Sequence, residues 1–241
     1  MTKGINSWLK NFAVHLFFRR FENRLYQALI NSDQPYRWFT KNRVDTQAIV
    51  CSNHWDEDLS WIVFSRHPVV VYSKSIKSSP NYVKYNKAQE AISYLSYIVD
   101  RYDSLPEYSI FVHGHRGSKH QNNFIDVIIN RLEFDKPIIN LNSPELYDYV
   151  EEGDDYNDKK YSWLSDNWGK LFGNDLDLPP KIGFYAHAQF AVHRDCIWQY
   201  KKEFWLNLYE WCRESQLSNY VTSRIFEYTW YYIFSKTPVF R

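Results

Sequence analysis

Short apolar runs alternate with longer amphipathic stretches from residue 46 onward. An unbroken apolar run such as 69–73 is typical of a strand that is buried on both faces. Strands are predicted over 47–51, 69–73, 109–112, 137–141 and 188–192. Helices are predicted over 57–64, 87–102, 123–132, 194–213 and 219–235. This order predicts an α/β fold with a mainly parallel central sheet and helices on both faces.

The first 45 residues have a different pattern. Residues 5–30 predict an amphipathic helix with a basic polar face, and residues 31–45 predict a connector, so the α/β domain is expected over 46–241. We favour a helix that packs on the domain or on a partner, and its alternative is a helix that lies at a membrane surface. The longest apolar run, 12–18, is too short to span a bilayer, and no signal-peptide cleavage pattern follows it.

Residues 151–181 predict looser structure. This stretch begins with an acidic run and ends at Pro179 and Pro180. Its acidic side chains, Asp154, Asp155 and Asp158, are interpreted as a solvated loop rather than a metal site, because two lysines follow them and no strand end precedes them.

Composition excludes several classes of protein. The 29 basic and 28 acidic residues give a net charge of +1, which disfavours binding to a nucleic-acid backbone. Three scattered cysteines form neither a zinc motif nor a disulfide framework and fit a reducing, cytoplasmic location. Aromatic residues make up 19% of the chain, and we expect most of them in the core.

The sequence after the third predicted strand carries the strongest candidate chemistry. His113, His115 and His120 fall within eight residues, just beyond a strand end, where open α/β sheets bind ligands. Three interpretations stay open. The rings donate to phosphate oxygens with Arg116 and Lys119, they bind a metal ion, or they are structural. For His115 the functional and structural interpretations weigh equally, whereas for the other two histidines the structural one is favoured.

Two further strand ends carry polar candidates. Glu57 follows the first strand, together with His54 and two neighbouring aspartates that fit helix capping. Lys74 follows the second strand, beside Tyr72, and either neutralises a phosphate group or is an ordinary solvated lysine. Motifs for a serine-nucleophile elbow, a phosphate-binding loop or a dinucleotide fold are absent from the sequence.

The order of these pieces resembles the family known as domain of unknown function 3431, from about residue 46 to 236. In that family the loop reads Phe-Leu-Gln-Gly-His-Pro and, about two residues later, His. Gly114, His115 and His120 match this pattern, His113 replaces the glutamine and Arg116 replaces the proline. The other matching segments are 57–61, 71–74, 90–91, 94–95, 102–106, 188–192 and 226–230.

That family is similar in turn to nucleotide-sugar glycosyltransferases of the A-type fold. In those enzymes an Asp-x-Asp motif after a central strand holds a divalent metal on the donor diphosphate. Here His113-Gly114-His115 stands at the corresponding place, and imidazole suits zinc, iron, copper or nickel better than magnesium or manganese. Either the metal differs, or no metal is used and cationic side chains meet the diphosphate.

The resemblance implies transfer of a sugar from a nucleoside-diphosphate sugar to a hydroxyl acceptor, such as that of a glycan. It implies a general base at Glu227, or alternatively at His187, and raises Glu90 above an ordinary first-turn acid. His115, Arg116, Lys119 and Lys74 would face the diphosphate. Two alternatives stay open, which are a catalytically inactive binding or scaffold domain and, less favoured, a histidine-ligated metallohydrolase.

Overall fold

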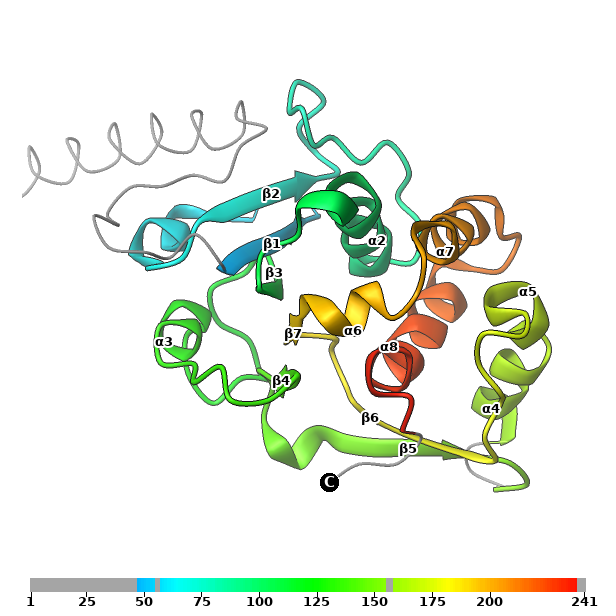
Figure 1. The fold of residues 1–241 in the computed structure, drawn as a ribbon. Helices are drawn as coiled ribbons and strands as arrows, with labels where there is room; N and C mark the ends of the chain where they lie inside the picture. The colour runs from blue at the N-terminus through cyan, green and yellow to red at the C-terminus, as the bar shows by residue number, and fades with distance from the viewer. Residues whose placement is uncertain (1–46, 55–56, 155–157, 238–241) are drawn as a thin grey trace, which may run out of the picture.

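A sheet with helices on both faces organises the chain, which confirms the α/β class (Figure 1). The computed structural model describes residues 47–54, 57–154 and 158–237. The helix expected over 5–30, the connector over 31–45 and the boundary before residue 46 lie outside the described residues. No helix in the described part of the chain is long and apolar enough to cross a membrane.

The central sheet has five strands in the order β2-β1-β3-β7-β4. The strands are β1 (Gln47–Asn53), β2 (Val69–Ser73), β3 (Tyr108–His113), β4 (Ile138–Asn140) and β7 (Phe190–His193). β1 pairs in parallel with β2 and β3, whereas β7 runs antiparallel to both β3 and β4. The sheet is therefore mixed, and the expectation of a mainly parallel sheet holds for its β2-β1-β3 half.

Alternate residues along each strand enter two separate cores, one on each face. Ile49 and Ile110 belong to the core beneath α3 (Ile125–Ile129) and the 3-10 helix η1 (Ser60–Phe64). Val50 and Phe111 belong to the larger core on the opposite face. Since side chains of a strand alternate between faces, this explains why the buried runs contain no polar alternation.

Three long helices cover the face of the larger core. They are α2 (Glu90–Arg101), α7 (Lys202–Glu214) and α8 (Asn219–Ser235) (Figure 1). Two shorter helices accompany them, η2 (Tyr102–Ser104) directly after α2 and α6 (Arg194–Trp198) before α7. Both α2 and α7 have an apolar face, whereas α8 is buried around almost its whole circumference from Thr222 to Phe234. Aromatic rings fill the space between α8 and the sheet, where Phe190 of β7 contacts the rings of Trp230 and Phe234, which confirms the expected use of aromatics in the core.

Residues 144–185 are more regular than the sequence predicts. They form η3 (Pro144–Leu146), β5 (Tyr147–Glu151), α4 (Asp158–Ser165), α5 (Trp168–Phe172) and β6 (Lys181–Tyr185). β5 and β6 pair as a separate antiparallel sheet, and β6 packs against α8 (Figure 1). The expectation of loose structure over 151–181 was wrong because α4 and α5 bury Leu164, Trp168 and Phe172 in the larger core, although charged residues surround them in the sequence.

Several predicted boundaries shift by a few residues. α2 begins at Glu90 rather than Lys87, because Ala88 and Gln89 have positive φ angles that no helix allows. The helix predicted over 194–213 is two helices, α6 and α7, which meet at Tyr200 and Lys201. The helix predicted over 123–132 covers only 125–129, and that over 57–64 is the shorter η1. The strand predicted over 188–192 covers 190–193 instead.

Candidate functional site

The histidine loop begins where β3 ends and is fixed to three other parts of the chain. The indole Nε1 of Trp61 donates to the carbonyl of Gly114 at 2.6 Å. The backbone N–H of His113 donates to the side-chain oxygen of Gln189 at 3.0 Å, and the N–H of Ser143 donates to the carbonyl of His120 at 2.9 Å. These bonds fix both ends of the loop, so its side chains project from a preorganised backbone.

The three histidine rings of the loop converge. Their ring centroids lie 5.1 Å apart for His113 and His115, 5.4 Å for His113 and His120, and 5.3 Å for His115 and His120. The Nε2 atom of each ring is buried and finds no hydrogen-bond partner among the described residues. An unsatisfied buried nitrogen costs about 1–3 kcal/mol, so three at one point call for an explanation.

A fourth histidine, His187, contacts this group from a distant part of the sequence. Its ring stacks on that of His120, with centroids 4.3 Å apart and an angle of 12° between the planes. His187 precedes β7, and because β7 is antiparallel to β3, the start of β7 lies at the sheet edge where β3 ends. The reversed strand thus brings together two segments that are 67 residues apart, from His120 to His187.

A pocket of about 310 Å³ opens beside the histidines. It lies at the carboxyl ends of β1 and β3, where Ser52 and His113 are register partners. The lining residues come from three segments, and they are Ser52, His54, Glu57, Gln89, Glu90, His113 and His115. Glu57, Glu90, His113 and His115 were all candidates from the sequence, and the structure places them in the lining of one pocket.

Burial keeps the histidines of the loop neutral. The pKa of His120 falls to about 4, and the pKa values of His113 and His115 also fall, chiefly because a buried imidazolium loses its hydration. Neighbouring rings lower the three values further. At neutral pH these rings therefore offer lone pairs rather than positive charges, which suits metal ligation better than donation to phosphate.

Burial disfavours the charged forms of two carboxyl groups of the pocket. Burial raises the pKa of Glu57, although its carboxylate accepts hydrogen bonds from the N–H of His54 at 2.7 Å and from the amide of Asn53 at 3.2 Å. Burial also raises the pKa of Glu90 to about 7, with a further increase from the charge of Glu227. A carboxyl group that titrates near pH 7 is suited to accepting or donating a proton at that pH.

Lys74 lies beside the pocket. Its ammonium group donates to the carbonyl of Gln89 and lies 3.5 Å from the ring Nδ1 of His54. Burial lowers the pKa of Lys74 to about 8, against the favourable charges of Glu90 and Glu57. Lys74 is not one of the residues that line the pocket, but it contacts two that are, and it carries a positive charge at neutral pH.

Backbone strain concentrates around this pocket. Five non-glycine residues of the described chain have positive φ angles, and four of them, Ala88, Gln89, His187 and Ala188, form two pairs. One pair precedes Glu90 at the pocket wall, and the other contains the histidine that stacks on His120. Such conformations cost about 1–3 kcal/mol each and occur where the surrounding structure holds a site in place.

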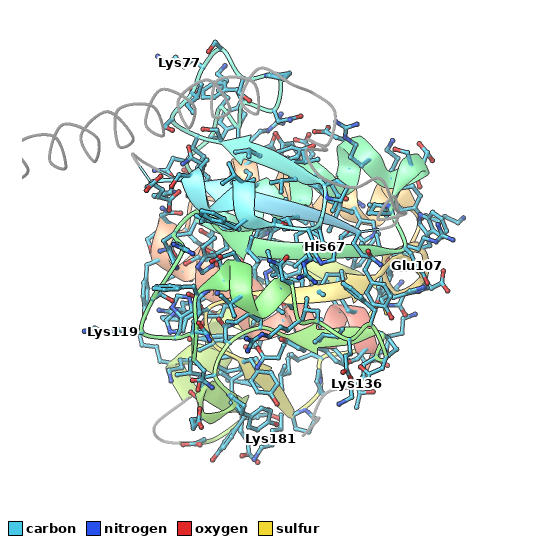
Figure 2. All side chains as sticks on the ribbon, turned by 90° about the vertical axis from the view of Figure 1, so that its left-hand side faces the viewer. His67, Lys77, Glu107, Lys119, Lys136 and Lys181 are labelled. Carbon is cyan, nitrogen blue, oxygen red and sulfur yellow. The ribbon has the colours of Figure 1, made fainter. Side chains whose placement is uncertain are left out.

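The structure places four other candidates outside the pocket wall. Arg116 pairs through two nitrogens with Asp126 at 2.9 and 3.0 Å, and Lys119 is exposed at the edge of the molecule (Figure 2). Tyr72 donates to Asp100 at 3.0 Å and lines a separate pocket. Glu227 is 7% exposed and accepts from the guanidinium of Arg224 at 2.5 Å, so its influence on the pocket is electrostatic.

Some residues of the site carried no signal in the sequence. Gln189 and Asn142 are buried and bond to each other at 3.0 Å, and Gln189 then holds the start of the histidine loop. Gln89 and Ser52 also line the pocket. The sequence pattern places Gln89 inside a predicted helix and Ser52 directly after a predicted strand, so neither position stands out. A polar residue two positions after His187 and directly before a buried strand was the available clue to Gln189.

Comparison with known proteins places the chain in one family. No curated protein matches it, and no solved structure matches it. The family described as "Protein of unknown function (DUF3431)" matches residues 49–241, which include every residue that lines the pocket. The chain therefore belongs to the DUF3431 family, as the resemblance in its motifs indicated.

Proposed function

We propose that this protein is a transferase that moves a sugar from a nucleoside-diphosphate sugar to a hydroxyl acceptor. The observation that supports this proposal is the pocket at the carboxyl ends of β1 and β3, which gathers acid–base groups from separate segments. Ligands of open α/β sheets bind at such edges. The sheet position of His113-Gly114-His115, after the central strand β3, is also the place that the family resemblance assigns to the donor diphosphate.

Glu90 is the best-placed proton acceptor for this reaction. It lines the pocket, and its pKa of about 7 allows it to take a proton from an acceptor hydroxyl at neutral pH. The hydroxyl oxygen would form a bond to the anomeric carbon, the bond from that carbon to the diphosphate would break, and its electron pair would leave with the diphosphate. Glu227, which was expected as the base, would then act on Glu90 through its charge, because Arg224 already occupies its carboxylate.

Among the candidate cations, Lys74 is the one that contacts residues of the pocket, and it would meet the leaving diphosphate from beside them. Arg116, which pairs with Asp126, and Lys119, which is exposed, were expected to share this role, but neither lines the pocket. Two carboxyl groups, on Glu57 and Glu90, face the same space. One lysine does not balance a diphosphate beside two acids, so donor binding is expected to need a further positive charge.

A panel of nucleotide sugars tests the proposal. The full chain is titrated by calorimetry with donors that carry uridine, guanosine or adenosine diphosphate, with and without Zn²⁺, Mn²⁺ or Mg²⁺, and release of the diphosphate is followed. We expect at least one donor to bind and to react. If none binds under any of these conditions, the proposal is refuted.

A variant pair identifies the base. Glu90→Gln should lower kcat by about 100-fold or more with little change in donor affinity, since a positioned acid or base contributes roughly that factor. Glu203→Gln is the matched control, because Glu203 also lies in the first turn of a helix but is exposed. Equal activity of both variants would contradict the role of Glu90.

The convergence of three histidines favours a second candidate, hydrolysis by metal-activated water. Three histidines and an open fourth position are the ligand set of several catalytic zinc sites. The same assay separates the two reactions. A transferase needs an added hydroxyl acceptor for rapid release of the diphosphate, whereas a hydrolase does not. Donor binding with no reaction in either case would instead indicate the inactive binding domain.

A further inference from the structure

We propose that His113, His115 and His120 form a binding site for one divalent transition-metal ion of the zinc class. One ring nitrogen from each residue lies within 4.8 Å of the other two. Among the described residues these are the three potential ligands that meet at one point. The site stands on their geometry and does not depend on which reaction the protein catalyses.

The distances allow closure around an ion without movement of the backbone. In a tetrahedral zinc site with bonds of about 2.05 Å, the ligand nitrogens lie about 3.3 Å apart. Three nitrogens at the corners of a triangle of 4.8 Å edge would each move inward by less than about 1 Å to reach that arrangement. Rotation about the side-chain bonds supplies such a movement.

The state of the ring nitrogens argues against a purely structural role. A structural histidine in a loop normally donates or accepts through both nitrogens once it is buried. Here His120 is only 9% exposed, and its Nε2 atom has no partner among the described residues, as is also true of His113 and His115. The three unpartnered atoms belong to adjacent rings, so one bound ion would satisfy all of them.

The donor set selects the kind of ion. Three imidazole nitrogens suit zinc and its neighbours in the transition series, whereas magnesium, calcium and manganese prefer oxygen ligands. His113 and His115 also line the pocket, so a fourth coordination position would face open space. An open position is typical of catalytic rather than structural zinc sites.

The surroundings hold the ligands in place, as the outer shell of a metal site does. Gln189 and Trp61 fix the backbone on both sides of His113, through the bonds to its N–H and to the carbonyl of Gly114. The stacked ring of His187 fixes the plane of His120. Such outer contacts orient metal-binding histidines in known sites.

An ion at this place would supply the positive charge that the pocket lacks. It would lie beside the wall formed by Glu57 and Glu90, where a diphosphate would otherwise meet two acids and one lysine. This role toward the diphosphate rests on the proposed function, whereas binding of the ion does not.

Direct titration with metal tests the site. The full chain is freed of metal with a chelator and titrated with Zn²⁺ by calorimetry and with Co²⁺ by visible absorption, which reports the coordination geometry. We expect one ion per chain with a Kd below about 1 µM. His115→Ala and His120→Asn should each weaken binding by more than the roughly 10–100-fold that changes outside the ligand set produce.

His193→Ala is the matched control for adventitious binding. His193 is another partly exposed histidine, with Asp195 at 3.4 Å and Glu107 at 4.0 Å, so it is the place where a stray ion would bind. Its replacement should leave the affinity unchanged. The proposal is overturned if the wild-type chain binds none of these metals, or if His193→Ala weakens binding while His115→Ala and His120→Asn do not.

Two readouts protect the test from misfolded variants and from failure of the proposed function. Zn²⁺ should raise the Tm of the wild-type chain but not of His120→Asn, which keeps a planar, polar side chain at this position. If Zn²⁺ binds and no nucleotide sugar does, the metal site stands and the transferase proposal fails. If a donor binds equally well with and without metal, the role of the ion toward the diphosphate is refuted.

Discussion

Replacement of Glu90 by glutamine should stabilise the protein, and the gain should depend on pH. Glu90 lies in the first turn of α2 with a pKa raised from 4.5 to about 7, chiefly by burial. The native state therefore binds a proton more tightly than the unfolded chain does. The protonated carboxyl group of Glu90 is compatible with folding, so with respect to this group the protein keeps its full stability below pH 4.5. That stability is lost as the pH rises through 7 and the folded chain must ionise Glu90. Glutamine has nearly the same shape and carries no charge at any pH.

The magnitude follows from the two pKa values. A rise from 4.5 to about 7 corresponds to a cost of about 3 kcal/mol once the carboxyl group is fully ionised in both states. The favourable charges of Lys74 and Arg224 are already included in that pKa. Linkage gives a cost of about 1 kcal/mol at pH 5 and about 3 kcal/mol at pH 8. Glu90→Gln should gain these amounts over the wild-type chain.

Urea denaturation of both proteins at the two pH values measures the difference. A chelator is present throughout, so that no ion alters the charge of the pocket. The Glu203→Gln control should change the free energy of unfolding by less than about 0.5 kcal/mol at both pH values. If the gain from Glu90→Gln is below about 1 kcal/mol at pH 8, or is the same at both pH values, the raised pKa assigned to Glu90 is wrong.

Three other substitutions test the packing around the site. Arg116→Ala should cost about 1–3 kcal/mol in urea denaturation, because it leaves the carboxylate of Asp126, 5% exposed, without its partner; a loss of donor affinity at unchanged stability would instead place the guanidinium in ligand binding. Phe111→Ala should lower the free energy of unfolding by about 3–5 kcal/mol, since the ring of Phe111 is fully buried in the larger core. A loss below about 1 kcal/mol would contradict that packing. Gly114→Ala places a methyl group against the carboxylate of Glu57, so calorimetry should show weaker donor binding, with a loss of stability under about 1 kcal/mol. Unchanged donor binding would show that this close approach has no consequence for the ligand.

The sequence pattern predicted the β2-β1-β3 half of the sheet because its signals are local. Continuous apolar runs identify strands that are buried on both faces, and β1, β2 and β3 each contain one. The helix α8 was predicted over its exact observed residues, 219–235. The β5-β6 hairpin was missed because its burial depends on contact with α8, which is distant in the sequence.

The candidate site could be predicted only in part, for the same reason. His113, His115, Glu57 and Glu90 meet at one pocket because parallel strands bring their ends to the same edge. The convergence of all three ring nitrogens depends on rotamers that a spacing does not determine. The direction of β7, which brings His187 onto His120, was likewise hidden, because strand orientation leaves no mark in a run of four residues.

The place of β7 in the sheet has a consequence for how the protein folds during synthesis. This strand separates β3 from β4, yet it comes from residues 190–193, about four-fifths of the way along the sequence. While the ribosome makes the earlier part, β3 and β4 each present an unpaired edge, and such edges invite pairing with other chains. Closure of the sheet must await a long-range contact, which is a slow kind of folding step. A nascent chain of this protein is therefore expected to keep these strand edges unpaired until β7 has inserted.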